Sequence, residues 1–233
     1  MKKNELPFIK EMFENIAPTY DFLNRLLSLR RDILWRKKLA SCIKLSKNSV
    51  ILDVATGTAD LALEIQKENP KTKIFGLDFS FNMLQIGKEK IYNNSKNNPI
   101  YVAAADAFNL PFPDSSFDAL SIAFGIRNIK DKKTVLKEFN RVLKPGGKVL
   151  ILELTMPEDK VLSNIYLLYF NKILPFIGRF FSKSLFAYSY LPSSVMGFPP
   201  SKEFASIMKK SGFNNIKWLK MSLGIVTMFI GKK

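Results

Sequence analysis

Residues 50–60 constrain the fold of this chain more than any other segment of the sequence. An unbroken apolar run from Val50 to Leu52 meets Asp53, small residues surround Gly57, and apolar residues at helical spacing follow from Leu61. This pattern predicts a buried strand, a tight turn and a helix, with the turn at the carboxyl end of the strand. Open parallel sheets bind their ligands at that end, where the first N–H groups of a helix can receive an anionic group.

The turn lacks the glycines of a dinucleotide-binding loop. The GxGxxG fingerprint needs three glycines, and here only Gly57 is present. The side chains around Gly57 would keep a pyrophosphate from approaching the backbone closely. The loop instead offers Gly57 for the bend, the Thr58 hydroxyl as a small donor, and the anions Asp53 and Asp60.

Carboxylates also follow the next two predicted strands. Asp78 closes the second strand about 20 residues on, a position that suits a ribose diol, and Asp106 ends the third. Aspartate is common in ordinary strand-ending turns, but an ordered set of three (Asp53, Asp78, Asp106) favours one binding site with a ring of negative charge. A cationic nucleoside suits that ring. S-adenosylmethionine, which carries a sulfonium, an amino group, a ribose and an adenine, is the predicted ligand.

The residue types that are missing exclude several chemistries. The 233 residues include no histidine, which excludes a histidine base, a Ser-His-Asp triad and a His-ligated metal site. The single cysteine, Cys42, permits no internal disulfide and argues against structural zinc, so no metal is predicted. A chain with one cysteine fits a reducing compartment, and we predict a cytoplasmic protein.

Charge and hydropathy bear on membranes and nucleic acids. The net charge is +16, but the lysines are scattered, so charge alone identifies no partner. Charged residues near the N-terminus interrupt any signal-peptide core, and polar residues and a proline break the apolar region 161–178, which cannot span a membrane. A basic surface beside an apolar segment favours peripheral contact with the inner face of a membrane.

Apolar runs and turn residues divide the remaining chain into alternating elements. Strands are predicted at 49–55, 73–79, 100–105, 117–124, 148–154, 215–222 and 225–230. Helices are predicted near 59–68, 80–94, 131–143 and 201–211, after a helical N-terminal cap over 1–46. This rhythm implies one domain, 1–233, built on a doubly wound, mostly parallel α/β sheet whose last strand is antiparallel. The cluster at 144–147 (KPGG) is interpreted as a plain turn before the fifth strand.

Residues 156–197 interrupt this alternation. They carry more apolar groups than an ordinary loop: Ile165, Leu167, Leu168, Tyr169, Phe170, Ile173, Leu174, Phe176, Ile177, Phe180 and Phe181. We interpret the segment as a helical lid over the strand ends that meets an apolar substrate or a bilayer. A homodimer interface or additional core are the alternatives.

With these motifs in view, the chain resembles the class I S-adenosylmethionine-dependent methyltransferases, and more narrowly the menaquinone and ubiquinone biosynthesis C-methyltransferase family. The resemblance covers nearly the whole chain. It rests on four segments: 20–24 (YDFLN) with Ser28 and Trp35, 124–128 (FGIRN), 141–147 (RVLKPGG) through Glu153, and 190–195 (YLPSSV). It implies a Rossmann-like seven-stranded fold, with Thr58, Asp78, Asp106 and Ala107 as cofactor contacts.

Two positions depart from the family's pattern. Asp32 stands where the first signature usually has a histidine, three residues before Trp35, and Ala123 stands where a serine commonly precedes the Phe-Gly of the fourth strand. Neither a role for that histidine nor a contact from that hydroxyl can therefore be assigned here.

The resemblance also implies methylation of a ring carbon of a prenylated hydroquinone. Such a carbon becomes nucleophilic when an ortho hydroxyl loses its proton, so the site must orient the ring and stabilise a phenolate. Arg127 is predicted to stabilise that charge, Asn128 to orient the ring oxygen, and Tyr20 to help Arg127 hold a water that takes the proton. Asp21 and Asn24 are predicted to close the substrate pocket. The structural alternatives are an ion pair with Asp131 or a helix-capping contact for Arg127, and a core role with a satisfied hydroxyl for Tyr20.

Three other functions compete with methylation of demethylmenaquinol. The nearest is methylation of a benzoquinol of the ubiquinone pathway. An RNA methyltransferase is suggested by the net charge but opposed by the apolar lid and the absence of a basic stripe. A non-catalytic binding module is opposed by the intact acids and Arg127.

Overall fold

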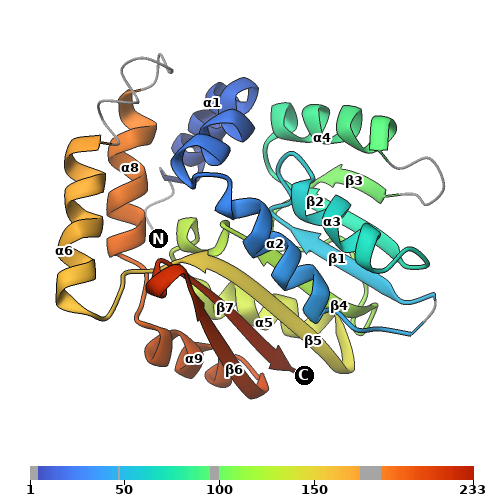
Figure 1. Ribbon diagram of the computed structural model, residues 1–233. Coiled ribbons are helices and arrows are strands. Elements are labelled where there is room, and N and C mark those ends of the chain that lie inside the picture. Colours follow the sequence, from blue (N-terminus) through green and yellow to red (C-terminus); the bar gives the residue numbers. More distant parts are fainter. Residues whose placement is uncertain (1–4, 47, 95–99, 174–184) are drawn as a thin grey trace.

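The computed structural model describes residues 5–46, 48–94, 100–173 and 185–233 (Figure 1). Within these ranges a seven-stranded sheet has the order β3-β2-β1-β4-β5-β7-β6. Its strands are β1 (Val50–Val54), β2 (Lys73–Asp78), β3 (Ile100–Ala104), β4 (Phe117–Ala123), β5 (Leu143–Leu154), β6 (Asn214–Met221) and β7 (Val226–Lys232). Strands β1 to β5 pair in parallel, and β7 is antiparallel to both of its neighbours. The predicted fold class is confirmed.

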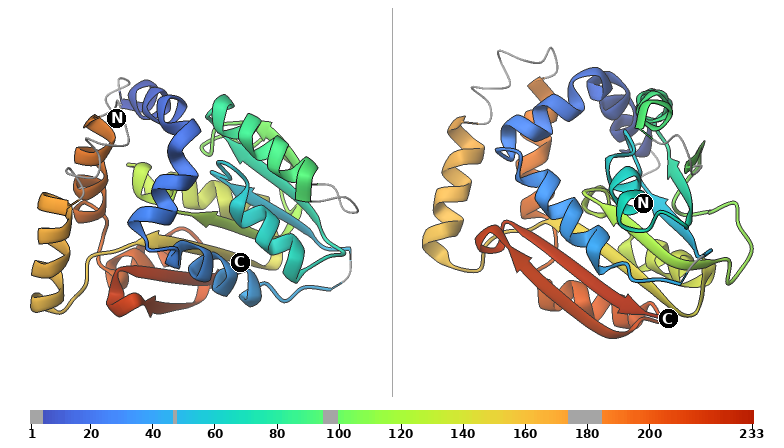
Figure 2. Two further views of the ribbon diagram at one scale, coloured as in Figure 1. Left: turned by 45° about the horizontal axis from the view of Figure 1, so that its top comes forward. Right: turned by 45° about the vertical axis from the view of Figure 1, so that its right-hand side comes forward.

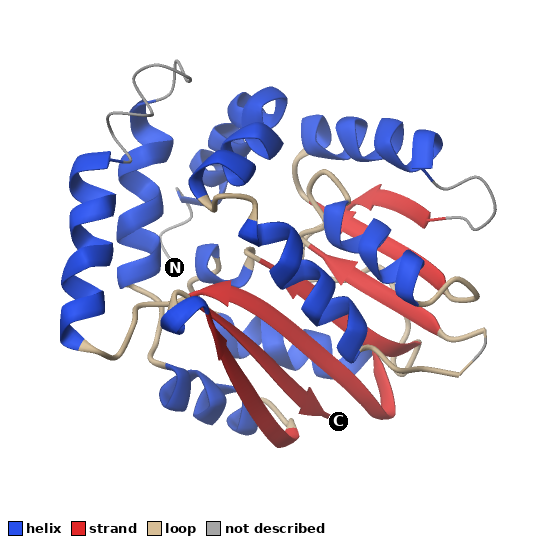
Figure 3. Cartoon of the chain, viewed as in Figure 1, coloured by secondary structure: helices blue, strands red, loops and turns tan. Residues whose placement is uncertain are grey.

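Helices lie on both faces of the sheet (Figures 2 and 3). They are α1 (Glu5–Leu27), α2 (Arg31–Cys42), α3 (Asp60–Glu68), α4 (Phe81–Asn94), α5 (Lys132–Val142), α6 (Lys160–Leu168), α8 (Leu185–Met196) and α9 (Ser201–Lys210). Short helices are η1 (Ile126–Asn128), η2 (Tyr169–Ile173) and η3 (Ser222–Gly224). None of the helices described is both long enough and apolar enough to cross a bilayer.

Alternation along the strands divides the core into two layers. In β1, Ile51 packs with residues of α2 and α3, whereas its neighbour Leu52 packs on the other face with residues of α5 and α9. Successive side chains of a strand point to opposite faces, so a strand buried on both sides reads as a continuous apolar run. This is why residues 50–52 could be recognised as a central strand from the sequence.

The Lys-Pro-Gly-Gly cluster lies inside a strand and not before it. Strand β5 begins at Leu143, pairs with Phe117, and resumes regular pairing at Lys148 after an irregular step. Gly146 has φ +77, and a Cβ on Gly147 would lie 2.8 Å from the carbonyl oxygen of Lys144. The prediction of a turn that precedes a strand at 148 was therefore wrong in its boundary. The chain bends within β5, where glycine tolerates the conformation and the close contact.

The segment 156–197, predicted as a lid, is mostly helical where the structure describes it, with α6, η2 and α8. Tyr166, Phe170 and Val195 of this segment are buried together with Leu23 of α1, forming a small cluster outside the main core. Residues 174–184, which include five of the apolar residues predicted for the lid, fall outside the described residues. The lid helices α6 and α8 thus pack on α1, which links them to the rest of the molecule.

Helix α1 is also attached to the start of α4. The Glu14 carboxylate accepts hydrogen bonds from the backbone N–H groups of Phe81 (2.7 Å) and Asn82 (2.9 Å). These N–H groups belong to the first turn of α4, where backbone N–H groups have no acceptor within the helix. A side chain 67 residues away in sequence therefore caps α4 and fixes α1 against it.

Replacing Glu14 with alanine should loosen this attachment. Because the substitution removes two capping bonds, we expect the free energy of unfolding to fall by roughly 1 kcal/mol. Urea denaturation of Glu14→Ala and of the control Glu11→Ala, an exposed acid on the same helix, would measure the difference. Equal stability of the two variants would show that the cap contributes nothing.

Candidate active site

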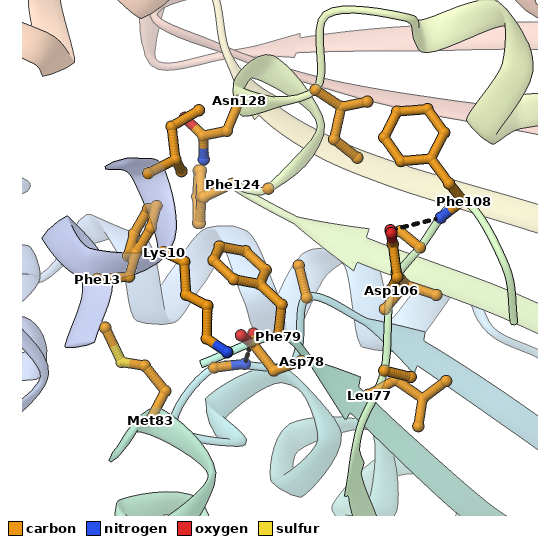
Figure 4. A pocket seen from close by; sticks show the side chains of 18 of the residues that line it. Lys10, Phe13, Leu77, Asp78, Phe79, Met83, Asp106, Phe108, Phe124 and Asn128 are labelled. Atoms are coloured by element: carbon orange, nitrogen blue, oxygen red, sulfur yellow. Dashed lines mark hydrogen bonds between the residues drawn. The ribbon is translucent and has the colours of Figure 1, made fainter. Parts of the chain in front are cut away.

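A cavity of about 390 Å³ lies at the carboxyl ends of the parallel strands, beneath α1 (Figure 4). Its floor includes Val54 at the end of β1, Gly57 in the turn that follows, and Asp78 at the end of β2. The predicted cofactor residues Asp106 and Ala107 line it after β3. Parallel strands deliver their carboxyl ends to one edge of the sheet, so residues distant in sequence meet in this cavity.

The Asp78 carboxylate organises the turn after β1. One oxygen accepts a hydrogen bond from the Gly57 N–H (2.8 Å) and the other from the Ser80 N–H (2.8 Å). Burial raises the pKa of Asp78, and these backbone donors oppose that shift. Gly57 has φ +54, a conformation that glycine adopts without strain. Each carboxylate oxygen has a second lone pair, so Asp78 can still accept from a ligand.

Residues after β3 form another wall. The Asp106 carboxylate accepts a hydrogen bond from the Phe108 N–H (2.9 Å), which holds this loop in place. Figure 4 shows Asp106 and Phe108 on one side of the cavity, across from Lys10 and Phe13 of α1. A flat ring and a diol could be accommodated between these walls.

Helix α1 contributes side chains that the sequence analysis did not assign to the site. Lys10 extends over the cavity toward Asp78, and Phe13 packs edge-on against Phe79 at 6.1 Å between ring centroids (Figure 4). From the sequence, Lys10 and Phe13 were placed only in a helical cap over 1–46. Helical periodicity identifies a buried face but does not distinguish a core from a cavity wall.

Asp53 does not join the predicted ring of carboxylates. It is 1% exposed and accepts hydrogen bonds from the hydroxyls of Thr56 (2.7 Å) and Ser121 (2.6 Å). Asp53 lies on the same face of β1 as Ile51, whereas the next residue, Val54, lines the cavity. Burial raises the pKa of Asp53 to about 6. Of the three acids expected to surround one ligand, the structure brings Asp78 and Asp106 to the cavity and leaves Asp53 beneath it.

Thr58 and Asp21 lie in a polar network beside this cavity and do not line it. The Thr58 hydroxyl donates to the Asp21 carboxylate (2.7 Å). The Lys90 ammonium of α4 pairs with Asp21 (2.5 Å) and Asp60 (2.6 Å). Burial opposes ionisation of Asp60, but Arg36 and Lys90 hold its pKa below the usual range. In this structure Asp21 therefore anchors α1 to the turn after β1.

Asp32, which replaces the family's usual histidine, extends this network. It is buried, pairs with Arg25 and with Arg36 (2.5 Å), and accepts a hydrogen bond from the Ser28 hydroxyl (2.9 Å). Arg25 also bonds Asp60 (2.5 Å). An anion at this position links α1, α2 and α3 through charge-assisted bonds.

A second cavity of about 520 Å³ lies further along α1, towards its carboxyl end. Its wall is mainly apolar and aromatic, with side chains from α1, α6, η2, α8 and η3, and it includes the predicted residues Asn24 and Arg127. Tyr20 and Phe124 line both cavities. These two aromatic residues are therefore the wall where the cavities meet.

Arg127 lies in the second cavity as half of a buried ion pair. Its Nη1 donates to Glu153 Oε1 (2.8 Å) and to the carbonyl oxygen of Phe124, and its backbone N–H donates to Glu153 Oε2 (3.0 Å). Burial alone would lower the pKa of Arg127, but Glu153 raises it, so the guanidinium stays charged. Its buried Nε has no hydrogen-bond partner among the residues that the structure describes.

The predicted alternative for Arg127, an ion pair with Asp131, was wrong. Asp131 instead caps α5 by accepting from the Thr134 N–H (3.0 Å). The partner that the sequence did not identify, Glu153, lies on β5, 26 residues away. Asn128 follows Arg127 in η1 but faces the first cavity, and its side-chain oxygen accepts a hydrogen bond from the Tyr190 hydroxyl (3.1 Å).

The chain matches the ubiE/COQ5 methyltransferase family over residues 1–233. The chain belongs to this family. It is 47% identical over 226 residues to the ubiquinone/menaquinone biosynthesis C-methyltransferase UbiE of Geotalea daltonii, which covers 97% of this chain and 96% of the relative. It is 42% identical over 229 residues to a demethylmenaquinone methyltransferase of Chlorobaculum parvum, covering 97% and 92% of the two chains.

Solved structures support the fold. A methyltransferase from Thermotoga maritima, described as a possible histamine N-methyltransferase, has a TM-score of 0.67 at 21% identity and covers 96% of this chain and 99% of that one. Phosphoethanolamine N-methyltransferase 2 of Haemonchus contortus, solved with S-adenosyl-L-methionine, has a TM-score of 0.61 at 20% identity and covers 82% and 50%.

Membership of this family makes the chain an S-adenosylmethionine-dependent C-methyltransferase. The first cavity fits that co-substrate chemically. It provides the carboxylates of Asp78 and Asp106 for hydroxyl and ammonium groups, and an aromatic wall at Tyr20 and Phe124 that suits a sulfonium cation.

Burial of Asp53 predicts a pH dependence of stability. Its pKa rises from 3.8 to about 6 on folding, so the unfolded chain binds fewer protons between those values. The stability that protonated Asp53 contributes is present below pH 4 and is lost as the pH rises to about 6, by roughly 1–3 kcal/mol. Asp53→Asn cannot ionise, so its stability should fall less than that of the wild type between pH 4.5 and 7.

Urea unfolding at several pH values would measure this difference. Asp118→Asn is a suitable control, because backbone and Lys144 contacts lower the pKa of Asp118 and move its titration out of this window. Parallel pH profiles for the wild type and Asp53→Asn would contradict a raised pKa at Asp53.

Proposed function

We propose that this enzyme methylates a ring carbon of a prenylated hydroquinone, most directly the conversion of demethylmenaquinol to menaquinol. The observation that carries the proposal is the wall of Tyr20 and Phe124 that the two cavities share. A nucleoside in the first cavity would present its methyl group where the two cavities adjoin. There it would meet the ring of a substrate bound in the second cavity, beside Tyr20 and Phe124. Relatives named demethylmenaquinone methyltransferase support this choice of substrate.

The second cavity suits an oily aromatic substrate. Tyr166, Tyr169 and Phe170 line it, and the rings of Tyr166 and Phe170 pack in a tilted arrangement at 4.3 Å between centroids. Burial raises the pKa values of Tyr166 and Tyr169, so both hydroxyls stay neutral. The apolar and aromatic part of this lining would bind a quinol ring and the start of its tail through apolar contact.

Arg127 is the group that would stabilise charge on the ring. S-adenosylmethionine, when bound, supplies an electrophilic methyl group. Arg127 remains protonated because of Glu153, and its guanidinium, which lines the second cavity, would stabilise the ring oxygen as that oxygen loses its proton. A water held between Arg127 and Tyr20 would accept this proton.

The remaining site residues have positioning roles in this proposal. Asp78 and Asp106 with Ala107 and Gly57 would hold the nucleoside, and Asn128, kept in place by Tyr190, would lie at the methyl-donor side. Asn24 would line the substrate cavity. Thr58 and Asp21 would act from beside the cavities, by holding the turn after β1 against α1.

We propose a cytoplasmic enzyme that takes its prenylated substrate at the inner face of the membrane. A benzoquinol ring is the alternative substrate, because relatives named for both ubiquinone and menaquinone biosynthesis align over 97% of the chain.

Product analysis would test the reaction. The enzyme is incubated with methyl-labelled S-adenosylmethionine and a short-chain demethylmenaquinol, and in parallel with the corresponding benzoquinol. We expect one labelled methyl group on a ring carbon, formed faster with the naphthoquinol. Label on oxygen, or no quinol product at all, would refute the proposal, and a preference for the benzoquinol would change the substrate.

The proposed catalytic role of Arg127 can be separated from its structural role as the partner of Glu153. Arg127→Ala would leave Glu153 buried without its partner, at a cost of roughly 3–5 kcal/mol, so loss of activity could reflect misfolding. The double variant Arg127→Met/Glu153→Gln removes both charges together. We expect its turnover to fall by at least about 100-fold while S-adenosylmethionine affinity, measured by calorimetry, stays within a few-fold.

Glu153→Gln alone is the matched control, since it keeps the guanidinium and should retain more turnover than the double variant. A folded double variant with turnover like that of the wild type would remove Arg127 from the chemistry.

A further inference from the structure

Two exposed leucines occupy turn positions that disfavour leucine. Leu29, between α1 and α2, has φ 50 and is 81% exposed, and Leu223, in η3 between β6 and β7, has φ 60 and is 73% exposed. A bulky side chain at positive φ is strained, and glycine or asparagine is the usual residue there. Neither leucine gains burial in return. A strained apolar residue at an exposed turn therefore calls for a functional explanation.

Both leucines lie at the mouth of the second cavity. Leu29, Leu223 and Ile165 of α6 all line this cavity, although their side chains are mostly exposed. On α6, Val161, Ile165 and Leu168 are 67%, 59% and 58% exposed and follow helical spacing along one face. We call the set Leu29, Val161, Ile165, Leu168 and Leu223 the rim. Figure 2 shows the three segments that carry it, the turn after α1, helix α6 and η3, arranged around one region of the molecule.

Basic residues accompany the rim. Arg30 and Arg31 follow Leu29 and are exposed, and the exposed Lys160 precedes Val161. The two nearby acids are already engaged, since Glu158 pairs with Lys220 (2.5 Å) and Asp159 caps α6. Apolar side chains flanked by arginine and lysine match the interface of an anionic bilayer, where apolar groups enter the acyl region and cations meet headgroups.

We propose that the rim docks on an anionic lipid bilayer, with Leu29 and Leu223 entering the acyl region and Arg30 and Lys160 facing the headgroups. The second cavity then opens directly into the bilayer. Its use as an entry path for a prenylated substrate rests on the proposed function, but docking itself does not require substrate. The alternative occupant of the rim is a second copy of this chain.

The test uses the full chain and vesicles without quinol or S-adenosylmethionine. Wild-type protein should sediment with vesicles of phosphatidylcholine and phosphatidylglycerol, and much less with phosphatidylcholine alone. Leu29→Asn/Leu223→Asn should lower the partition coefficient by about tenfold or more, because it removes two inserting side chains. Asparagine tolerates positive φ, so the melting temperature of this variant should equal or exceed that of the wild type. Leucines with a purely structural role would instead lower it.

Two further variants make the result specific. Phe81→Ser/Tyr92→Ser removes two exposed aromatic side chains from α4, which Figure 1 shows on the far side of the molecule from α6. It should bind vesicles within about twofold of the wild type. Arg30→Glu/Lys160→Glu should abolish the preference for anionic vesicles.

Unchanged vesicle binding by the leucine variant would overturn the proposal. So would a wild-type dimer in solution that becomes monomeric in the leucine variant while vesicle binding persists, since the rim would then be a subunit interface. Because no turnover is measured, failure of docking and failure of the proposed methylation are distinguishable.

Discussion

Both cavities depend on the way helix α1 is held across the carboxyl ends of the parallel strands. The helix supplies Phe13 to the first cavity, Asn24 to the second, and Tyr20 to the wall between them. Polar attachments outside the cavities hold it at α4 through Glu14 and at the turn after β1 through Asp21. Directional bonds thus fix the position of the helix, so the cavity walls themselves can remain apolar and aromatic.

The charged groups of the site are compensated by different means. Arg127 is neutralised in place by Glu153, which keeps the guanidinium protonated in a buried position. Asp78 is compensated by backbone N–H groups, which bring no additional charge into the first cavity. Asp53, with only two hydroxyl partners, is the acid for which burial dominates. The first cavity therefore presents the carboxylates of Asp78 and Asp106 together with Lys10, and the second presents Arg127, compensated by Glu153, to an anionic ring oxygen.

Local sequence patterns predicted most of the fold and part of the site. The apolar run 50–52 could be recognised as a strand because a central strand is buried on both faces. Asp78 and Asp106 reach the cavity because parallel strands end at one edge of the sheet. Asp53 was predicted to face the ligand but does not line the cavity. The direction of its side chain depends on the residue at which β1 ends, and the sequence pattern does not fix that residue. Lys10 and Phe13 were missed because helical periodicity does not reveal what a face covers. The pairing of Glu153 with Arg127 was missed because a contact between residues distant in sequence leaves no local signal.

The central claim is that the methyl donor and its acceptor meet where the two cavities adjoin, beside Tyr20 and Phe124. A crystal structure with S-adenosylhomocysteine bound would test it most directly. The account predicts the nucleoside against Asp78 and Asp106, with its sulfur facing Tyr20 and Phe124. Binding of the nucleoside in the second cavity, or with its sulfur directed away from these two residues, would contradict it.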